Sequence, residues 1–229
     1  MNPSEAPPKR YRVLIVDDHP MTREGLVHLI GNQPDLTVCA EAATAGSALT
    51  AVENTNPDLV LADITLPGRS GIELIKDIKA VQPALPVLVI SMHDESLYAE
   101  RALRAGAAGY LMKVEGGAKL LAAIRHVLAG EIYVSAKISA QILRGFTGQA
   151  AAVGAGAAAP VAQLSDREFE VFSLLGHGMP TRGIGEQLHV SVKTVEAHRT
   201  NIKAKLGIDT AAELIAYAAR WITAEGSKT

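Results

Sequence analysis

The sequence contains a single cysteine, Cys39, among its 229 residues. One cysteine cannot build an internal disulfide framework, and it excludes a cysteine-rich zinc site. No apolar run reaches the roughly 18 residues of a membrane span, and the first residues, MNPSEAPPKRYR, lack the apolar core of a signal peptide. These absences predict a protein of a reducing compartment, the cytoplasm, without membrane contact.

The chain also lacks a strong charge of either sign. Its 22 Lys and Arg residues oppose 24 Asp and Glu residues, which leaves a net charge of −2. Net charge alone therefore favours neither nucleic acid nor an acidic membrane as a partner. With 48% hydrophobic residues, the chain has enough apolar material for one large domain or two small ones.

Residues 11 to 130 alternate short apolar runs with amphipathic stretches. The apolar runs are YRVLIV, LTVCAE, DLVLA, PVLVI and AGYLM. Their length and continuous apolarity are typical of strands buried on both faces. The stretches between them place apolar residues at helical spacing, as at Ile72, Ile75 and Ile78. We therefore predict an α/β domain, a doubly wound five-stranded parallel sheet, over residues 11–130 after a tail of residues 1–10.

A second region follows a change in composition. Residues 145–163 carry no charge and consist almost wholly of small and apolar residues, so we interpret residues 131–163 as a tail helix and a Gly/Ala-rich linker. Residues 164–229 then show four short helical patterns. They predict a small all-α domain.

Polar side chains stand at the ends of the expected strands. The first strand ends at Asp17 and Asp18, the third at Asp63, the fourth at Ser91 and the fifth at Lys113. The carboxyl ends of parallel strands meet at one edge of a sheet, where ligand sites form. Three carboxylates together imply a compensating cation, and oxygen ligands suit Mg²⁺. A metal, an amine and a hydroxyl beside a carboxylate make a phosphoryl site, in which the carboxylate can form an aspartyl phosphate.

Residues 11–130 resemble the receiver domain of two-component response regulators. The resemblance rests on the acidic pair, on Asp63 in D-x-x-x-P-G, on Ser91, on Tyr110 and on Lys113 in YLMK. It implies a flavodoxin-like fold and transfer of a phosphoryl group to Asp63 from a phosphohistidine of a sensor kinase. By this resemblance, Asp18, Asp63 and the backbone carbonyl of Thr65 would bind Mg²⁺, with Asp17 acting through water. Ser91 and Lys113 would contact the acyl phosphate. Tyr110 would be the switch residue.

One helix of the second region has the character of a recognition helix. Over residues 192–206, Val195, Ile202 and Leu206 share one face, while the opposite face is small and polar with basic residues at both ends. An ordinary surface helix of a small bundle is the alternative, because residues 164–229 hold eight basic and eight acidic residues.

Residues 164–229 also resemble the LuxR-type helix-turn-helix, and the two regions together resemble the NarL/FixJ class of transcription regulators. The matching stretches are LSDREFEVFSLLGHG, IGEQLHVSVKTVEAHRTNIKAKLGI and AAELIAYA. The resemblance implies that Glu196, Ala197 and Thr200 face bases, and that Lys193, Thr194, Arg199, Lys203 and Lys205 contact the DNA backbone. Gly183 and Gly185 depart from the family, which has stronger helix formers there.

The chain is thus expected to be a DNA-binding transcription regulator activated by phosphorylation, not an enzyme, that binds double-stranded promoter DNA as a homodimer. At rest, the surface of the fourth helix, fifth strand and fifth helix, or one near it, would hold the second domain. After release, the last helix around Leu214, Ile215 and Trp221 would pair two chains.

Two other functions remain open. A Mg²⁺-dependent phosphatase could use Asp63 as its nucleophile, although such enzymes need a second acid where this chain has Thr65, and no cap domain encloses a substrate. A DNA-binding protein with a vestigial receiver would not need the intact set of acids, Ser91 and Lys113.

Overall fold

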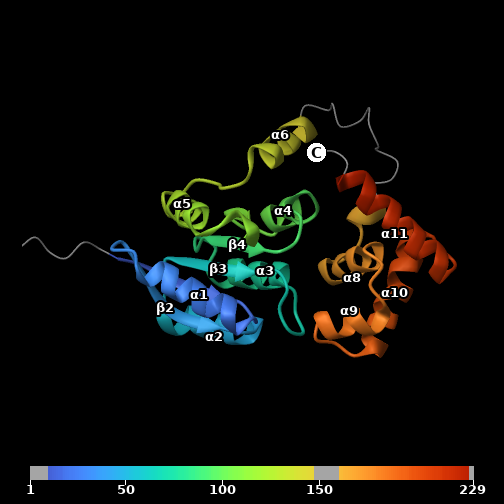
Figure 1. Cartoon of the computed structure of the whole chain (residues 1–229), viewed down its shortest axis with the longest axis horizontal. Coiled ribbons are helices and arrows are strands. Elements are labelled where there is room, and N and C mark those ends of the chain that lie inside the picture. The colour runs from blue at the N-terminus through green and yellow to red at the C-terminus, as the bar shows by residue number, and fades with distance from the viewer. Residues whose placement is uncertain (1–9, 147–159, 227–229) are drawn as a thin grey trace, which may run out of the picture.

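The computed structural model of the chain describes residues 10–146 and 160–226, so the N-terminal tail and much of the predicted linker lie outside the described residues. A five-stranded parallel sheet with the strand order β2-β1-β3-β4-β5 forms the N-terminal half (Figure 1). Its strands are β1 (Tyr11–Val16), β2 (Leu36–Ala42), β3 (Leu59–Asp63), β4 (Val87–Ser91) and β5 (Gly109–Met112).

Helices cover both faces of this sheet, as the alternating sequence pattern predicts. They are α1 (Pro20–Gly31), α2 (Ala45–Thr55), α3 (Gly71–Val81), α4 (Glu95–Arg104), and, after a 3₁₀ turn at Lys113–Glu115, α5 (Gly117–Leu128). Helices α1 and α5 pack on one face through Ile30 and Ile124, and helices α2, α3 and α4 pack on the other. The doubly wound five-stranded fold is confirmed.

A segment after α5 covers the edge of the sheet beside β5. The Tyr110 N–H donates to the carbonyl of Tyr133, and the Tyr133 N–H donates to the carbonyl of Ala108. Helix α6 (Ala136–Phe146) then packs against α4, and Ser135 donates a hydrogen bond to Glu95. The edge strand is therefore paired along this stretch, which removes its open hydrogen-bonding groups.

Four helices form the C-terminal part, as the sequence predicts. They are α8 (Asp166–Gly176), α9 (Thr181–Gln187), α10 (Val192–Leu206) and α11 (Ala211–Gly226). Their core contains Phe169, Phe172, Val195 and Ile202, all at most 1% exposed, and it is continuous with the apolar layer under α3 and α4. Among the described residues, no helix is long and apolar enough to cross a membrane.

The C-terminal end of the predicted linker is folded in the structure. Residues 160–162 are helical, and Val161 is 2% exposed because it packs into the apolar layer beside α4. The carbonyl of Val161 also accepts a hydrogen bond from Arg101 on α4. The absence of charge and of an amphipathic pattern concealed this packed end.

Candidate functional site

Three predicted site residues meet at the carboxyl edge of the sheet. The ammonium of Lys113 lies 2.6 Å from Asp63 Oδ2 and 2.7 Å from Asp17 Oδ2. Asp17 is 0% exposed and Asp63 is 4% exposed. Burial raises the pKa of Asp63, and the attraction of Lys113 offsets this only in part. Burial opposes the charge of Lys113, but the two carboxylates outweigh it and raise the pKa of the ammonium.

Asp18 completes an acidic cluster with room for a cation. Ligand atoms of Asp17, Asp18, His19 and Asp63 all lie within 4.8 Å of one another. Asp18 Oδ1 is buried and has no hydrogen-bond partner, although His19 Nδ1 approaches it to 2.7 Å. A buried carboxylate oxygen without a donor is costly unless a ligand neutralises it. The oxygen ligands and this orphaned atom fit a Mg²⁺ ion.

The loop after β3 holds Asp63 in place through a close backbone crossing. The Gly71 N–H donates to the carbonyl of Ile64 at 2.6 Å. A Cβ at Gly71 would lie 2.0 Å from the carbonyl oxygen of Asp63, so only glycine fits there. Gly68 has a φ of +76°, consistent with the predicted bend at Pro67-Gly68. The Thr65 N–H also donates to Asp63 Oδ1 at 3.3 Å.

His93 links the other predicted site residues. The Ser91 hydroxyl oxygen accepts a hydrogen bond from the His93 N–H, and the Tyr110 hydroxyl donates to the His93 carbonyl. The imidazole lies 2.9 Å from the Thr65 hydroxyl and stacks on Tyr98. Burial, followed by the charges of His177 and Lys113, lowers the pKa of His93 to about 4. The imidazole is therefore neutral at physiological pH.

Helix α10 presents the face that the sequence predicts. Val195 and Ile202 are 0% exposed, whereas Lys193, Thr194, Glu196, Ala197 and Thr200 are exposed. The basic residues differ in their surroundings. Lys193 is open to solvent, and Lys203 donates to the carbonyl of Asp209. Arg199 is bonded to Thr181 and Glu196 with only 14% of its side chain exposed, and Lys205 is paired with Glu168 at 2.6 Å.

The glycines of α9 have a packing reason. A Cβ at Gly185 would lie 2.9 Å from the carbonyl oxygen of Val190, and one at Gly183 would lie 3.2 Å from Met179 Cγ. Gly185 thus lets the turn between α9 and α10 close against the helix. The lower helix propensity of glycine is the cost of that approach.

Comparisons with known proteins agree with both halves of this architecture. Residues 13–125 match the family model of the response regulator receiver domain, and residues 162–218 match that of bacterial regulatory proteins of the luxR family. The oxygen regulatory protein NreC of Staphylococcus aureus is 37% identical over 208 residues, which cover 90% of this chain and 96% of that protein. The chain belongs to the response regulators of the NarL/FixJ class.

Solved structures of response regulators share the fold. A LuxR-family response regulator from Aurantimonas sp. SI85-9A1 is 40% identical and covers 61% of this chain and 99% of its own, with a TM-score of 0.57. RcsB from Salmonella enterica serovar Typhimurium, bound to the promoter rprA in the presence of the phosphomimetic BeF3-, is 22% identical. It covers 92% of this chain and 99% of its own, with a TM-score of 0.59.

The LuxR-type domain docks on the receiver domain through helix α8. Ser70, the N-cap of α3, donates a hydrogen bond of 2.6 Å to Glu170, and Lys76 pairs with Asp166 at 2.6 Å. Burial raises the pKa of Glu170 to about 7 against the opposing effects of Arg167 and Ser70. This docking surface consequently contains a buried acid beside the loop that carries Asp63.

Helix α4 supplies the second half of the docking surface. Arg101 donates to the carbonyls of Leu164 and Val161, and its guanidinium lies 4.0 Å above the ring of Phe169. Tyr98 meets the same ring edge-on at 5.1 Å. Helix α4 belongs to the predicted docking face. The edge of β5 is covered by Tyr133, and the docking surface extends instead to α3.

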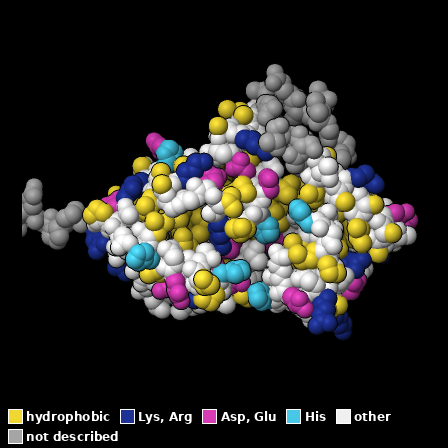
Figure 2. Space-filling model, in the orientation of Figure 1, with side chains coloured by type: hydrophobic (Ala, Val, Ile, Leu, Met, Phe, Trp, Pro, Cys, Tyr) yellow, Lys and Arg dark blue, Asp and Glu magenta, His cyan; other side chains and the backbone are white. Residues whose placement is uncertain are grey.

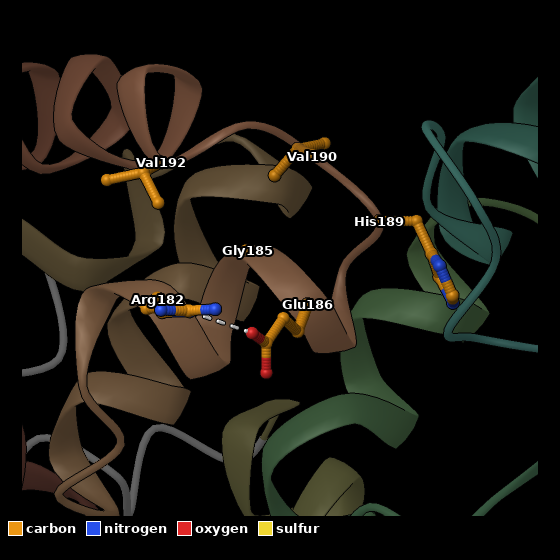
Figure 3. Close-up of a pocket in the computed structure, with 6 residues that line it drawn as sticks. All are labelled: Arg182, Gly185, Glu186, His189, Val190 and Val192. Carbon is orange, nitrogen blue, oxygen red and sulfur yellow. Dashed lines mark hydrogen bonds and ion pairs between the residues drawn. The ribbon is translucent and has the colours of Figure 1, made fainter.

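The turn between α9 and α10 reaches the acidic cluster itself. His189 Nε2 lies 3.2 Å from Asp18 Oδ2. Histidine side chains gather where the two domains meet (Figure 2). An open hollow of about 520 Å³ lies behind the turn, lined by Arg182, Gly185, Glu186, His189, Val190 and Val192 (Figure 3). Sequence analysis missed this contact because residues 18 and 189 lie far apart in the chain.

Proposed function

We propose that this response regulator accepts a phosphoryl group on Asp63 from a sensor histidine kinase and so controls its binding to promoter DNA. The observation that carries the proposal is the position of Lys113, bonded to both Asp63 and Asp17 beside a buried, orphaned oxygen of Asp18. A buried carboxylate with a fixed ammonium beside it can act as nucleophile toward a phosphoryl group.

Each polar side chain of the site has a role in this transfer. Asp63 would attack phosphorus, forming a P–O bond while the P–N bond to the kinase histidine breaks. Lys113 would neutralise a phosphoryl oxygen, and the Ser91 hydroxyl would donate to another. Asp18, Asp63 and the Thr65 carbonyl would hold Mg²⁺, with Asp17 acting through water, and the bound ion supplies positive charge to the phosphoryl oxygens.

The exposed face of α10 would read DNA in the major groove. Glu196, Ala197 and Thr200 lie on that face, where small side chains permit close approach to base edges. Lys193 and Thr194 stand at its N-terminal end, and Lys203, Lys205 and Arg199 remain the other proposed backbone contacts. The RcsB structure bound to a promoter with a phosphomimetic supports this coupling of phosphorylation to DNA binding.

The docked arrangement would be the resting state. The base-reading face of α10 is exposed, but the receiver domain stands against His189, two residues before the N-cap Ser191. A recognition helix in the major groove has DNA backbone on both sides of it. The receiver domain would therefore occupy space that one DNA strand needs. Release of α8 would clear that space.

A homodimer on DNA would use the exposed part of the predicted α11 contact. Leu214 is 0% exposed, and Trp221 packs edge-on against Phe169 and Phe172. Ile215 is 41% exposed. The face around Ile215 would therefore form the dimer contact, and the RcsB dimers in complex with DNA support a dimer of this chain. A cytoplasmic location is part of this proposal, because a regulator that binds promoter DNA must reach it there.

The decisive experiment measures phosphorylation and DNA binding on the same protein. The chain is incubated with Mg²⁺ and acetyl phosphate, and its intact mass and promoter affinity are determined. We expect the wild-type chain and the control Asp209→Asn to gain one phosphoryl mass and to bind DNA more tightly. Asp63→Asn should gain neither. A phosphoryl mass on Asp63→Asn would refute the assignment of the acceptor.

The same experiment, with an added assay on a phosphomonoester, separates the two alternatives. Equal DNA affinity before and after phosphorylation would favour a vestigial receiver. Rapid, repeated turnover of a phosphomonoester that requires Asp63 would favour a phosphatase.

A further inference from the structure

His189 belongs to the LuxR-type domain but contacts the acidic cluster of the receiver domain. It lies in the turn between α9 and α10 with a φ of +52°, and its Nε2 is 3.2 Å from Asp18 Oδ2. Its side chain points away from the other residues that line the hollow and toward the receiver ribbon (Figure 3). The left-handed backbone of the turn gives the imidazole this direction.

The two oxygens of Asp18 have different surroundings. Oδ1 is buried and accepts no hydrogen bond, although His19 Nδ1 lies 2.7 Å from it, whereas Oδ2 faces His189. The Asp18 side chain is only 8% exposed, whereas the His189 side chain that contacts it is 51% exposed. A carboxylate is an acceptor, so the ring nitrogen must be the donor here. Oδ2 is thus held by a donor, and Oδ1 becomes available to a ligand when the exposed His19 side chain turns aside.

We propose that His189 is a positioning residue for the metal ligand Asp18, supplied to the receiver domain by the docked LuxR-type domain. This proposal rests on the proposed Mg²⁺ site. Ligating carboxylates are commonly oriented by a hydrogen bond to the oxygen that does not bind the metal, and losing such a partner lowers metal affinity about 10- to 100-fold. His189 fixes Asp18 so that Oδ1 stays turned toward the ion.

A thermodynamic consequence follows for the whole chain. If docking of the LuxR-type domain raises the affinity for Mg²⁺, then Mg²⁺ strengthens docking by the same factor. The free divalent ion therefore favours the resting arrangement, and release of the domain loosens the metal site. The helix-turn-helix turn and the metal site are coupled through one hydrogen bond, without passing through Ser91 or Tyr110.

The test is calorimetric titration of the full chain with Mg²⁺. We expect His189→Ala to weaken Mg²⁺ binding about tenfold, because the contact is lost while Asp18 remains. His189→Gln should restore most of the affinity, since its amide N–H can donate to Oδ2. Both variants carry the same backbone strain at a positive φ, so their difference isolates the donor. Arg182→Ala, a solvent-exposed change on the same domain, should bind Mg²⁺ like the wild type.

Hydrogen exchange in α8 provides the second measurement. Mg²⁺ should slow exchange of the α8 amides in the wild-type chain and have no effect on them in His189→Ala. Unchanged or higher Mg²⁺ affinity in His189→Ala, with Asp18→Asn abolishing binding, would overturn this inference alone. If Asp18→Asn bound Mg²⁺ like the wild type, the proposed metal site would fall as well.

Discussion

Gly71 has no room for a side chain, and this lack of space fixes the backbone at Asp63. The ideal Cβ would lie 2.0 Å from the Asp63 carbonyl oxygen and 2.8 Å from the Cα of Ile64. Both contacts are with backbone atoms, which cannot move aside as a flexible side chain can. Helix α3 therefore begins directly against the end of β3, and its first residue fixes the position of the Asp63 backbone.

Gly71→Ala should displace the Asp63 backbone. We expect a loss of about 1–3 kcal/mol in the free energy of unfolding, because overpacking a close contact strains its surroundings. The rate of phosphorylation by acetyl phosphate should fall by a larger factor than stability explains. Urea denaturation and mass spectrometry measure the two effects. Gly46→Ala, at a helical position with no atom within 4 Å of the added Cβ, is the matched control; it should leave the rate of phosphorylation unchanged and raise the free energy of unfolding by up to about 1 kcal/mol, since alanine is the better helix former.

At the scale of elements, the sequence predicts most of the architecture and part of the site. The apolar runs and the helical spacing of residues such as Ile72, Ile75 and Ile78 reflect local periodicity, and the structure places strands and helices there. Tertiary contacts are the reason that positions 71 and 185 require glycine, as Gly71 and Gly185 show, and that Tyr133 pairs with β5. No local pattern contains that information.

Helix α8 should make stability depend on pH through Glu170. Its folded pKa of about 7 exceeds the ordinary value of 4.5, so the folded chain binds this proton more tightly than the unfolded chain. The stabilisation is therefore present below pH 4.5, falls as pH rises toward about 7, and then stays constant, with a total change of at most about 3 kcal/mol. Denaturation at several pH values, compared with Glu170→Gln, isolates this contribution. The wild-type chain should lose stability relative to Glu170→Gln as pH rises from about 4.5 to about 7. A stability difference between the two proteins that stays the same over this pH range would contradict the assignment.

The basic residues of helix α10 should differ in how much each contributes to DNA binding. Lys193 is exposed at the N-terminal end of the proposed DNA-reading face, so Lys193→Ala should weaken binding to all sequences and lower the salt slope by about one. Lys205 is already paired with Glu168, so Lys205→Ala should act mainly through packing against α8 and change the slope less. Binding titrations at several salt concentrations compare the two. Equal slopes for Lys193→Ala and the wild type would mean that this end of α10 does not meet phosphate.

At the scale of the whole molecule, contacts of α8 with α3 and α4 and the contact of His189 with Asp18 hold the domains together. Helix α8 meets α3 through Ser70 and Lys76, and it meets α4 through Tyr98 and Arg101. The Asp63 loop lies between β3 and the N-cap of α3, so a change at Asp63 has a short path to Glu170 through Ser70. Phosphorylation thus requires no force through the linker.

Arg101→Ala should therefore release the LuxR-type domain without phosphorylation. Arg101 satisfies the carbonyls of Leu164 and Val161, and in the docked state its removal would leave both without this donor. Hydrogen bonds from charged groups contribute about 1.5–3 kcal/mol each, so the docking equilibrium should shift by at least tenfold toward release. The DNA affinity of the unphosphorylated chain should rise by up to the same factor, limited by the affinity of the fully released form.

Arg104→Ala is the control, because Arg104 is exposed on the same helix and pairs with Glu100. Mobility-shift titrations measure the DNA affinities of the two variants and the wild type. Equal affinities for Arg101→Ala, Arg104→Ala and the wild type would show that docking does not restrain DNA binding.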